Sequence, residues 1–158
     1  MIVRLIAALM SLVSIAAIAQ SQELATCRNP TGKAYRHFSD AQDKADSGWH
    51  DERISIGVVT LVQASDGSFD MLYVDVRNKP ISMMQDGAKV VLLRRSADAI
   101  SLLAHYDGNT TEIYSFFREK DGKSRYTVMT SRVGSLAISQ KSSVMVGDCD
   151  PILFDRIK

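Results

Sequence analysis

The chain has 158 residues, of which 46% are hydrophobic and 23% charged, and its 19 basic residues nearly balance its 18 acidic ones. A chain of this length can bury a substantial core within one domain. The balanced charge excludes the broad basic field by which proteins attract nucleic acid or anionic lipid, so neither partner is expected.

The N-terminus has the pattern of a secretory signal peptide. Met1–Arg4 carries one positive charge, and Leu5–Ile18 is almost wholly apolar. The small residues Ala17 and Ala19 occupy the −3 and −1 positions of a cleavage site after Ala19. The apolar run is shorter than the roughly 20 residues of a membrane-spanning helix, and polar residues follow it. We therefore expect cleavage after Ala19, an exported domain of residues 20–158 in the periplasm or medium, and no membrane span after cleavage.

The chain has two cysteines, Cys27 and Cys149, near opposite ends of the expected mature domain. An isolated pair in an oxidising compartment favours a disulfide bond. No C-x-x-C spacing or further ligand set indicates a metal site, and no cofactor is expected. The segment Leu24–Cys27 resembles the lipobox of bacterial lipoproteins, which implies a lipidated Cys27 as the alternative, but Thr26 stands where that motif has Gly, Ala or Ser.

Short runs of β-branched and aromatic residues alternate with turn signals along most of the chain. Four Asp-Gly pairs favour the positive φ angles of tight hairpin turns; they are Asp66-Gly67, Asp86-Gly87, Asp107-Gly108 and Asp121-Gly122. The predicted strands are Ile54–Gln63, Phe69–Arg77, Ile81–Met84, Lys89–Arg95, Ala99–Tyr106, Thr111–Glu119, Lys123–Ser131, Leu136–Gln140 and Ser142–Val146, with a short final strand at Ile152–Phe154.

The predicted fold class is all-β, an antiparallel meander of about eight to ten strands closed into a barrel, with a β-sandwich as the alternative. One short N-terminal helix is predicted, because Ser39–Gln42 fits a capping box and Gly48 would end the helix. This layout resembles that of lipocalin-type barrels. Lipocalins have Gly-x-Trp at the first strand, whereas Gly48 and Trp49 are adjacent here, so no lipocalin residue roles are transferred.

Several predicted strands are apolar on both faces. In Phe69–Arg77, one face carries Phe69, Met71 and Tyr73, and the other face carries Leu72, Val74 and Val76. A sheet with one face in water needs only one apolar face per strand. We therefore expect part of the outer surface to be covered by the N-terminal arm, by an unknown partner, or by a second copy in a homodimer.

The segment Trp49-His50-Asp51-Glu52 is the most suggestive cluster for chemistry, since an imidazole oriented by a carboxylate can act as a general base. In an extended chain, however, His50 and Asp51 point to opposite sides. We favour a structural role, in which Trp49 plugs the barrel end and a carboxylate bonds a turn. No nucleophile motif accompanies the cluster, so no catalytic residue and no metal ligand is predicted.

The leading hypothesis is a non-enzymatic binding module for an unknown ligand, such as a small apolar molecule. The predicted ligand-binding residues are Tyr35, Trp49, His50, Tyr73 and Tyr106. The first alternative is a protein–protein interaction or enzyme-inhibitor protein of the cell envelope, similar in architecture to small exported barrel inhibitors of bacterial lysozyme. A hydrolytic enzyme is the second alternative.

Overall fold

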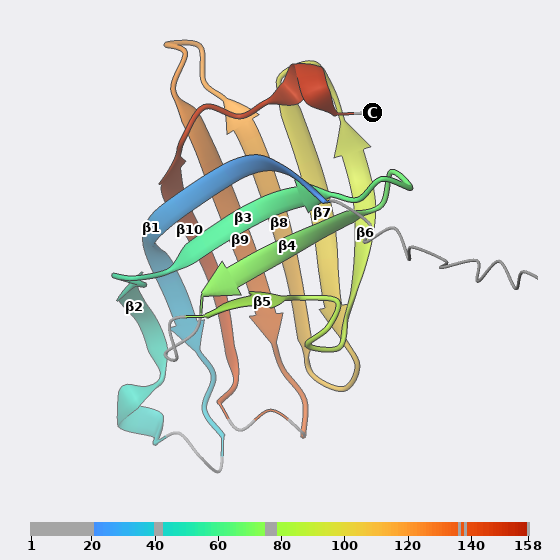
Figure 1. Ribbon diagram of the computed structural model, residues 1–158. Helices are drawn as coiled ribbons and strands as arrows, with labels where there is room; N and C mark the ends of the chain where they lie inside the picture. The colour runs from blue at the N-terminus through green and yellow to red at the C-terminus, as the bar shows by residue number, and fades with distance from the viewer. Residues whose placement is uncertain (1–20, 40–42, 75–78, 136, 138, 158) are drawn as a thin grey trace, which may run out of the picture.

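The computed structural model describes residues 21–39, 43–74, 79–135, 137 and 139–157, and these consist almost entirely of β-strands (Figure 1). The strands are β1 (Gln22–Arg36), β2 (Gly48–Arg53), β3 (Val58–Gln63), β4 (Phe69–Val74), β5 (Pro80–Ser82), β6 (Ala88–Arg95), β7 (Ala99–Tyr106), β8 (Thr110–Arg118), β9 (Ser124–Arg132) and β10 (Lys141–Cys149). All pairings within this sheet are antiparallel, which confirms the all-β, antiparallel part of the predicted fold class.

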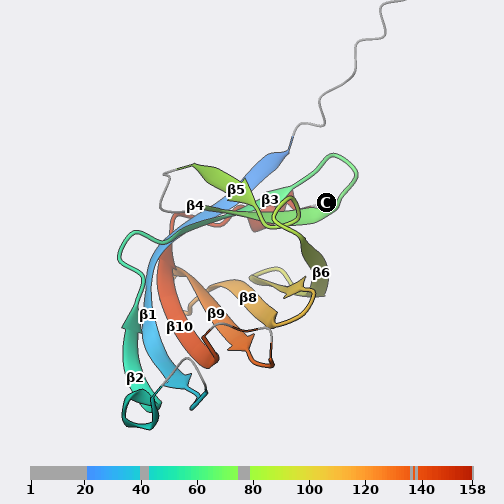
Figure 2. The same ribbon diagram turned by 90° about the horizontal axis from the view of Figure 1, so that it is seen from below.

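The sheet is an open half-barrel whose strand order is β5-β4-β3-β1-β10-β9-β8-β7-β6, with β2 paired to β1 beside β3 (Figure 2). The first and last strands, β1 and β10, pair in the middle of this order. The order instead ends at β5 and β6, which follow each other in sequence and form no ladder in the described chain. We call the β1–β10 pair the closed seam and the gap between β5 and β6 the open seam. The predicted closure of the barrel is therefore not confirmed.

The closed seam is held by backbone pairing and by a covalent bond. Cys27 and Cys149 lie directly opposite each other and form a disulfide across 122 residues of sequence, as predicted. A sulfur in this bond is not available for the lipid that a lipobox would imply. Gly32 lets the two strands approach closely, because a Cβ atom there would lie 2.0 Å from the carbonyl oxygen of Val144.

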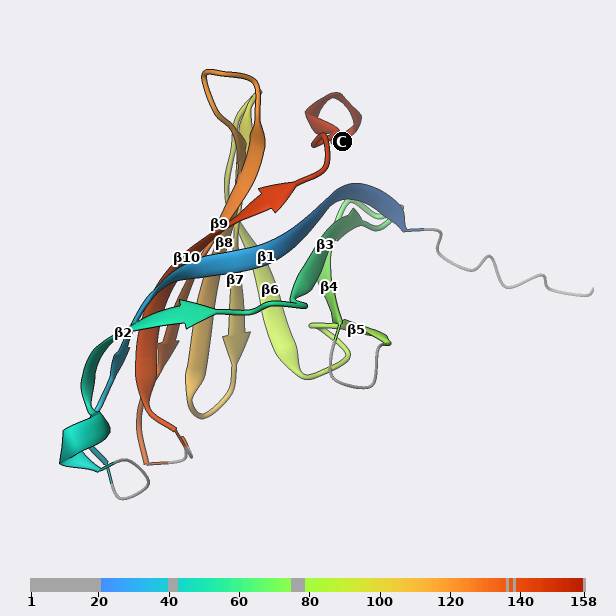
Figure 3. The ribbon, with the colours of Figure 1, turned by 90° about the vertical axis from the view of Figure 1, so that its left-hand side faces the viewer.

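Strand β1 was missed by the sequence prediction. It has 15 residues and contains a bulge between Arg28 and Thr31, where Asn29 has a φ of 52° and Pro30 lacks an amide hydrogen. Because these residues are typical of turns, the sequence does not indicate a strand here. The strand bends along its length and pairs with both β10 and β3 (Figure 3). One half of β1 pairs with β2 and the other half with β3. Residues 54–57 connect β2 to β3, so the strand predicted as Ile54–Gln63 begins only at Val58.

Other predicted elements differ at the ends of the domain. The predicted helix is not confirmed: Asp43 is extended and the turn η1 (Lys44–Asp46) is a three-residue 3-10 helix, while positions 40–42 lie outside the described residues. The described parts of Leu136–Gln140 are not strand. In place of the final strand, the turn η2 (Phe154–Arg156) follows an irregular segment. The predicted signal peptide, residues 1–19, and the end of the predicted strand Phe69–Arg77, residues 75–77, also lie outside the described residues.

The four predicted Asp-Gly turns are confirmed. The glycines have φ angles of 87° at Gly67, 98° at Gly87, 107° at Gly108 and 88° at Gly122. Glycine adopts such angles without the steric cost that a Cβ atom would impose. Each turn marks where the next strand can begin, and the predicted bounds of β6 to β9 lie within one residue of those observed.

The core lies on the concave side of the half-barrel. Alternate residues of each strand face it, as shown by β8, where Tyr114 and Phe116 are buried. Of the five methionines that follow Ala19, three belong to this core: Met71, Met83 and Met145. At one end of the sheet, Phe154 and Ile157 pack against the core and cover it (Figure 1).

Candidate functional site

The inward-facing residues of β7 to β10 form successive rows across the sheet, and these rows change from apolar to charged. The register of the four strands gives the rows Leu102-Tyr114-Val128-Met145, then Ala104-Glu112-Thr130-Ser143, then Tyr106-Thr110-Arg132-Lys141. The first row belongs to the buried core, the second introduces hydroxyls and a carboxylate, and the third carries two basic groups. A polarity gradient therefore runs along the concave face.

A cavity of about 770 Å³ lies against this gradient, and we call it the interior cavity. Its walls come from both halves of the sheet: Val59 and Tyr73 on one side, and Val128, Met145 and Arg132 on the other. This volume is within the range of pockets that hold small ligands, which combine mainly apolar walls with a few polar groups. The interior cavity has this composition.

The carboxylate of Glu112 is held by two hydroxyl groups inside the cavity. Tyr114 donates its phenol to Glu112 Oε2 at 2.7 Å, and Thr130 donates to Oε1 at 3.3 Å. Burial, followed by the charge and hydrogen bond of Glu112, raises the pKa of Tyr114 well above its usual value. Tyr114 is therefore a neutral donor at physiological pH.

The two basic groups of the third row have different partners. Lys141 donates to Glu52 Oε1, and this ion pair crosses β1 with both side chains at least three-quarters buried. Within the described chain, Arg132 donates only its Nε, to Thr110 Oγ1 at 3.3 Å. Among the described residues, no carboxylate lies within ion-pair distance of Arg132.

The deep end of the cavity contains a polar atom without a partner. Tyr126 is 1% exposed, and its hydroxyl bonds no other described group. Burial alone raises its pKa well above the usual value of tyrosine. Ser143 Oγ, in the second row, is likewise buried without a hydrogen bond within the described chain. Unsatisfied buried hydroxyls are unusual in proteins and need an explanation.

Two of the predicted ligand-binding residues, Tyr73 and Tyr106, line the interior cavity. Tyr73 donates its hydroxyl to Asp86 Oδ2 at 2.8 Å, which fixes the ring at the end of the cavity near the open seam. Burial, with the charges of Glu112 and Asp86, raises the pKa of Tyr106. The prediction therefore placed these two aromatic residues together, although they are 33 positions apart in β4 and β7.

The other predicted residues lie away from the cavity. Tyr35 and Trp49 are opposite each other on the outer face, with ring centroids 5.4 Å apart at 76°, and Trp49 is 70% exposed. The prediction that Trp49 plugs the barrel end is wrong. His50 lies opposite Ala34 on the inward face, and its Nε2 is 3.0 Å from the backbone oxygen of Asp46.

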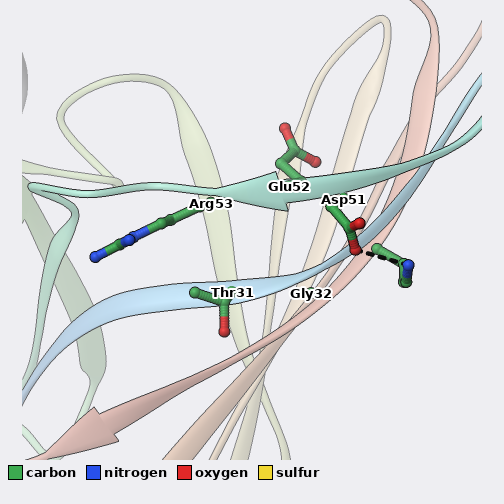
Figure 4. A pocket seen from close by; sticks show the side chains of 6 residues that line it. Thr31, Gly32, Asp51, Glu52 and Arg53 are labelled. Atoms are coloured by element: carbon green, nitrogen blue, oxygen red, sulfur yellow. Dashed lines mark ion pairs between the residues drawn. The ribbon is translucent and has the colours of Figure 1, made fainter.

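The carboxylates next to His50 form ion pairs instead of bonding a turn. Asp51 contacts Lys33 at 2.6 Å, while Glu52 contacts Lys141 from the other face of β2. Figure 4 shows Asp51 and Glu52 pointing to different sides of β2, with a dashed line for the ion pair of Asp51, beside a cavity of about 470 Å³ between β1 and β2. Charged residues make up most of the lining of this second cavity, and no aliphatic or aromatic residue contributes to it, in contrast to the interior cavity.

The remaining histidines bond hydroxyl groups. His37 Nε2 is 3.2 Å from Ser142 Oγ, and His105 Nδ1 is 3.1 Å from Thr111 Oγ1. No group of three or more potential metal-ligating side chains occurs among the described residues. In the same part of the chain, no helix is long and apolar enough to cross a membrane.

The outer face of the sheet has an apolar row of its own. Val91, Leu103, Ile113, Met129 and Val144 follow one another across β6 to β10. Val91, Met129 and Val144 are 48%, 42% and 52% exposed. The neighbouring outward positions of β7 to β10 are mostly serine, threonine and valine, so this part of the surface has little charge.

No protein-family model, curated protein or solved structure matches this chain. Its function must therefore be argued from the interior cavity and the outer face. Sequence analysis missed Glu112, Arg132 and Lys141 because each occurs singly within or beside a strand. Counting every second residue from the apolar positions Tyr114 and Val128 would have placed Glu112 and Arg132 on the inward face.

Proposed function

We propose that this protein is an exported, non-enzymatic binding module that holds a small amphipathic molecule in its interior cavity. The observation that carries the proposal is the polarity gradient along the cavity wall. A molecule with an apolar body and a polar head would bury its body against Val128 and Met145 and place its head near Arg132. Burial of apolar ligand surface would contribute about 25 cal/mol per Å² before the costs of association are subtracted.

Export is part of the proposal. The disulfide between Cys27 and Cys149 suits an oxidising compartment, and the N-terminal sequence has the pattern of a signal peptide. A soluble carrier or sensor in such a compartment would need a built-in cavity for a water-insoluble ligand, which is consistent with the half-barrel.

Filling the cavity tests the proposal. We expect Val128→Trp to weaken binding of the neutral apolar dye Nile red by about tenfold or more, since the indole would occupy the ligand volume. Met129→Trp is the matched control, because the neighbouring residue of β9 faces outward. Thr130→Phe, one row further along the cavity wall, provides a second filling variant if Val128→Trp fails to fold.

Dye fluorescence titration measures the effect, and circular dichroism checks that each variant is folded. Unchanged binding in a folded Val128→Trp or Thr130→Phe protein would rule out the interior cavity as the site. Native mass spectrometry of protein purified without organic solvent would show whether a small molecule is already bound.

The outer apolar row favours a second candidate function, protein–protein interaction through a homodimer. A two-fold interface pairs one surface patch with itself, and a face of little charge meets no like-charge repulsion in such a pair. Charge depletion is also typical of interface cores. The row Val91, Leu103, Ile113, Met129 and Val144 would form the centre of the interface.

Sedimentation velocity over a range of concentrations tests this second candidate. The wild-type protein should form a dimer that Val144→Glu dissociates, while Tyr35→Glu, at another exposed outer position, should leave it intact. A monomer at every concentration, up to several hundred micromolar, would exclude the homodimer.

A further inference from the structure

We propose that the ligand of the interior cavity is an amphipathic acid, whose carboxylate binds the guanidinium group of Arg132. This inference rests on the proposed binding function and names the chemical class that the site selects. It follows from the partners of the charged side chains that line the interior cavity, which are Asp86, Glu112, Arg132 and Lys141, and of Glu52, which pairs with Lys141.

Four of these five groups already have partners. Asp86 accepts a hydrogen bond from the hydroxyl of Tyr73. Lys141 and Glu52 neutralise each other across β1. Both carboxylate oxygens of Glu112 accept hydrogen bonds from hydroxyl groups. Arg132 is the exception, because it donates only its Nε to a neutral hydroxyl, and its two terminal amino groups have no carboxylate in reach among the described residues.

The geometry of arginine suits a carboxylate better than a neutral head. Its planar guanidinium presents parallel N–H donors that match the two oxygens of a carboxylate, and such charge-assisted bonds are about twice as strong as neutral ones. The Nε–H bond to Thr110 holds the group in place on β9. A bound acid would therefore complete the hydrogen bonding of Arg132 in a partly desolvated position.

The cavity wall also limits how the acid can lie. Arg132 and Val128 are four residues apart on one strand, which corresponds to about 13 Å along the wall. An alkyl chain of medium length would span this distance, with its head at Arg132 and its body beside Met145. Glu112 lies one row deeper, so its negative charge would oppose a carboxylate that entered further and would keep the acid head at the third row.

Glu112 also defines the rival ligand, since an amphipathic amine would be attracted to its carboxylate. The experiment therefore compares decanoate, decanol and decylamine, which share one apolar chain, by isothermal titration calorimetry at pH 7.5. We expect decanoate to bind about tenfold or more tightly than decanol, because a hydrogen bond between charged groups is about twice as strong as one between neutral groups. Decylamine should be the weakest.

The variant Arg132→Gln should bind decanoate and decanol within about twofold of each other, while its affinity for decanol stays near that of the wild type. Arg53→Gln is the control, because Arg53 is exposed on the outer side of β2 and should keep the preference for the acid. Circular dichroism confirms that both variants are folded.

The outcomes separate the two proposals. Equal affinity for decanoate and decanol, tightest binding of decylamine, or an acid preference that survives Arg132→Gln would overturn the acid assignment while leaving the binding function in place. Failure of all three compounds and of Nile red to bind would overturn both.

Discussion

The closed seam and the open seam differ in how two strands meet. At the closed seam, β1 and β10 share a ladder from Cys27 to Arg36 and a disulfide bond, and Gly32 allows close approach. At the open seam, β5 has three residues, and the outer edge of β6 pairs with no strand of the described chain; Val91 and Leu93 of β6 are exposed. The chain therefore joins its distant ends firmly and leaves its opening between two strands that are adjacent in sequence.

The open seam has features that discourage pairing. Pro80 begins β5 and has no amide hydrogen to donate to a further strand. A register shift between Leu92 and Arg94 interrupts β6, and irregularities of this kind are common at sheet edges. The comparison teaches that meander topology brings strands into order, while local chemistry decides whether the last pair forms.

The largest expected effect comes from breaking the closed seam. Replacing both cysteines, Cys27→Ser and Cys149→Ser, should lower the free energy of unfolding by up to about 4–5 kcal/mol, because the bond restricts a long loop in the unfolded chain. Urea unfolding of wild type, with and without reductant, and of the double variant measures this loss. A change below about 1 kcal/mol would show that backbone pairing alone holds the seam.

A smaller loss is expected when a Cβ atom is added at the closed seam. Gly32→Ala would place that atom within 2.0 Å of Val144 O, so the strands must separate at a cost of about 2 kcal/mol. The comparison is Gly87→Ala in the turn between β5 and β6, where nothing lies within 4 Å and the cost of about 1 kcal/mol comes from its positive φ.

Hydrogen exchange distinguishes the two glycine variants. Gly32→Ala should speed exchange of amides in β1 and β10, whereas Gly87→Ala should leave those amides protected. Equal exchange at the closed seam in both variants would contradict the proposed close approach.

The third prediction concerns Tyr126, whose side chain is buried in the core beside the closed seam. Tyr126 lies next to Gly147 of β10, and burial raises its pKa above that of an unfolded tyrosine. Above about pH 10 the unfolded chain releases this proton while the folded chain keeps it, so stability is lost as pH rises, by about 1.4 kcal/mol per pH unit. Below pH 10 both states hold the proton, and this source of pH dependence vanishes.

Tyr126→Phe should remove that contribution to the slope between pH 10 and 11. At pH 7 the same variant should change stability by no more than about 1 kcal/mol, because the hydroxyl has no partner among the described residues to lose. Urea unfolding at several pH values provides both measurements, and an unchanged alkaline slope would indicate that water reaches the hydroxyl.

The strands that were predicted correctly are those whose sequence signals lie within or next to the strand itself. Strands β4, β6, β8 and β9 each begin shortly after an Asp-Gly pair, and β7 was predicted with its observed bounds, Ala99–Tyr106. Strand β1 could not be recognised, because Pro30, Gly32 and the positive φ of Asn29 all resemble a turn when the pairing partner is unknown. Its strand conformation depends on β10, which is more than a hundred residues away.

The candidate site was predictable only in part for the same reason. Aromatic type pointed to Tyr73 and Tyr106, which do line the cavity, but also to Trp49, which is outside it. Whether a residue of β2 faces inward depends on its register with β1, and that register was not available from sequence. Arg132 was overlooked because a basic residue at a strand end usually indicates a solvated position.

The smallest expected effect concerns the free edge of β6. Leu93→Lys replaces a side chain that is 50% exposed beside the bulge, so the change in stability should remain within about 0.5 kcal/mol. Because a charged edge discourages pairing with another chain, the variant should also aggregate more slowly on heating. Thermal unfolding and light scattering measure the two effects. A loss of 2 kcal/mol or more would mean that the β6 edge is packed against the rest of the half-barrel, and that the two seams differ less than their hydrogen bonding indicates.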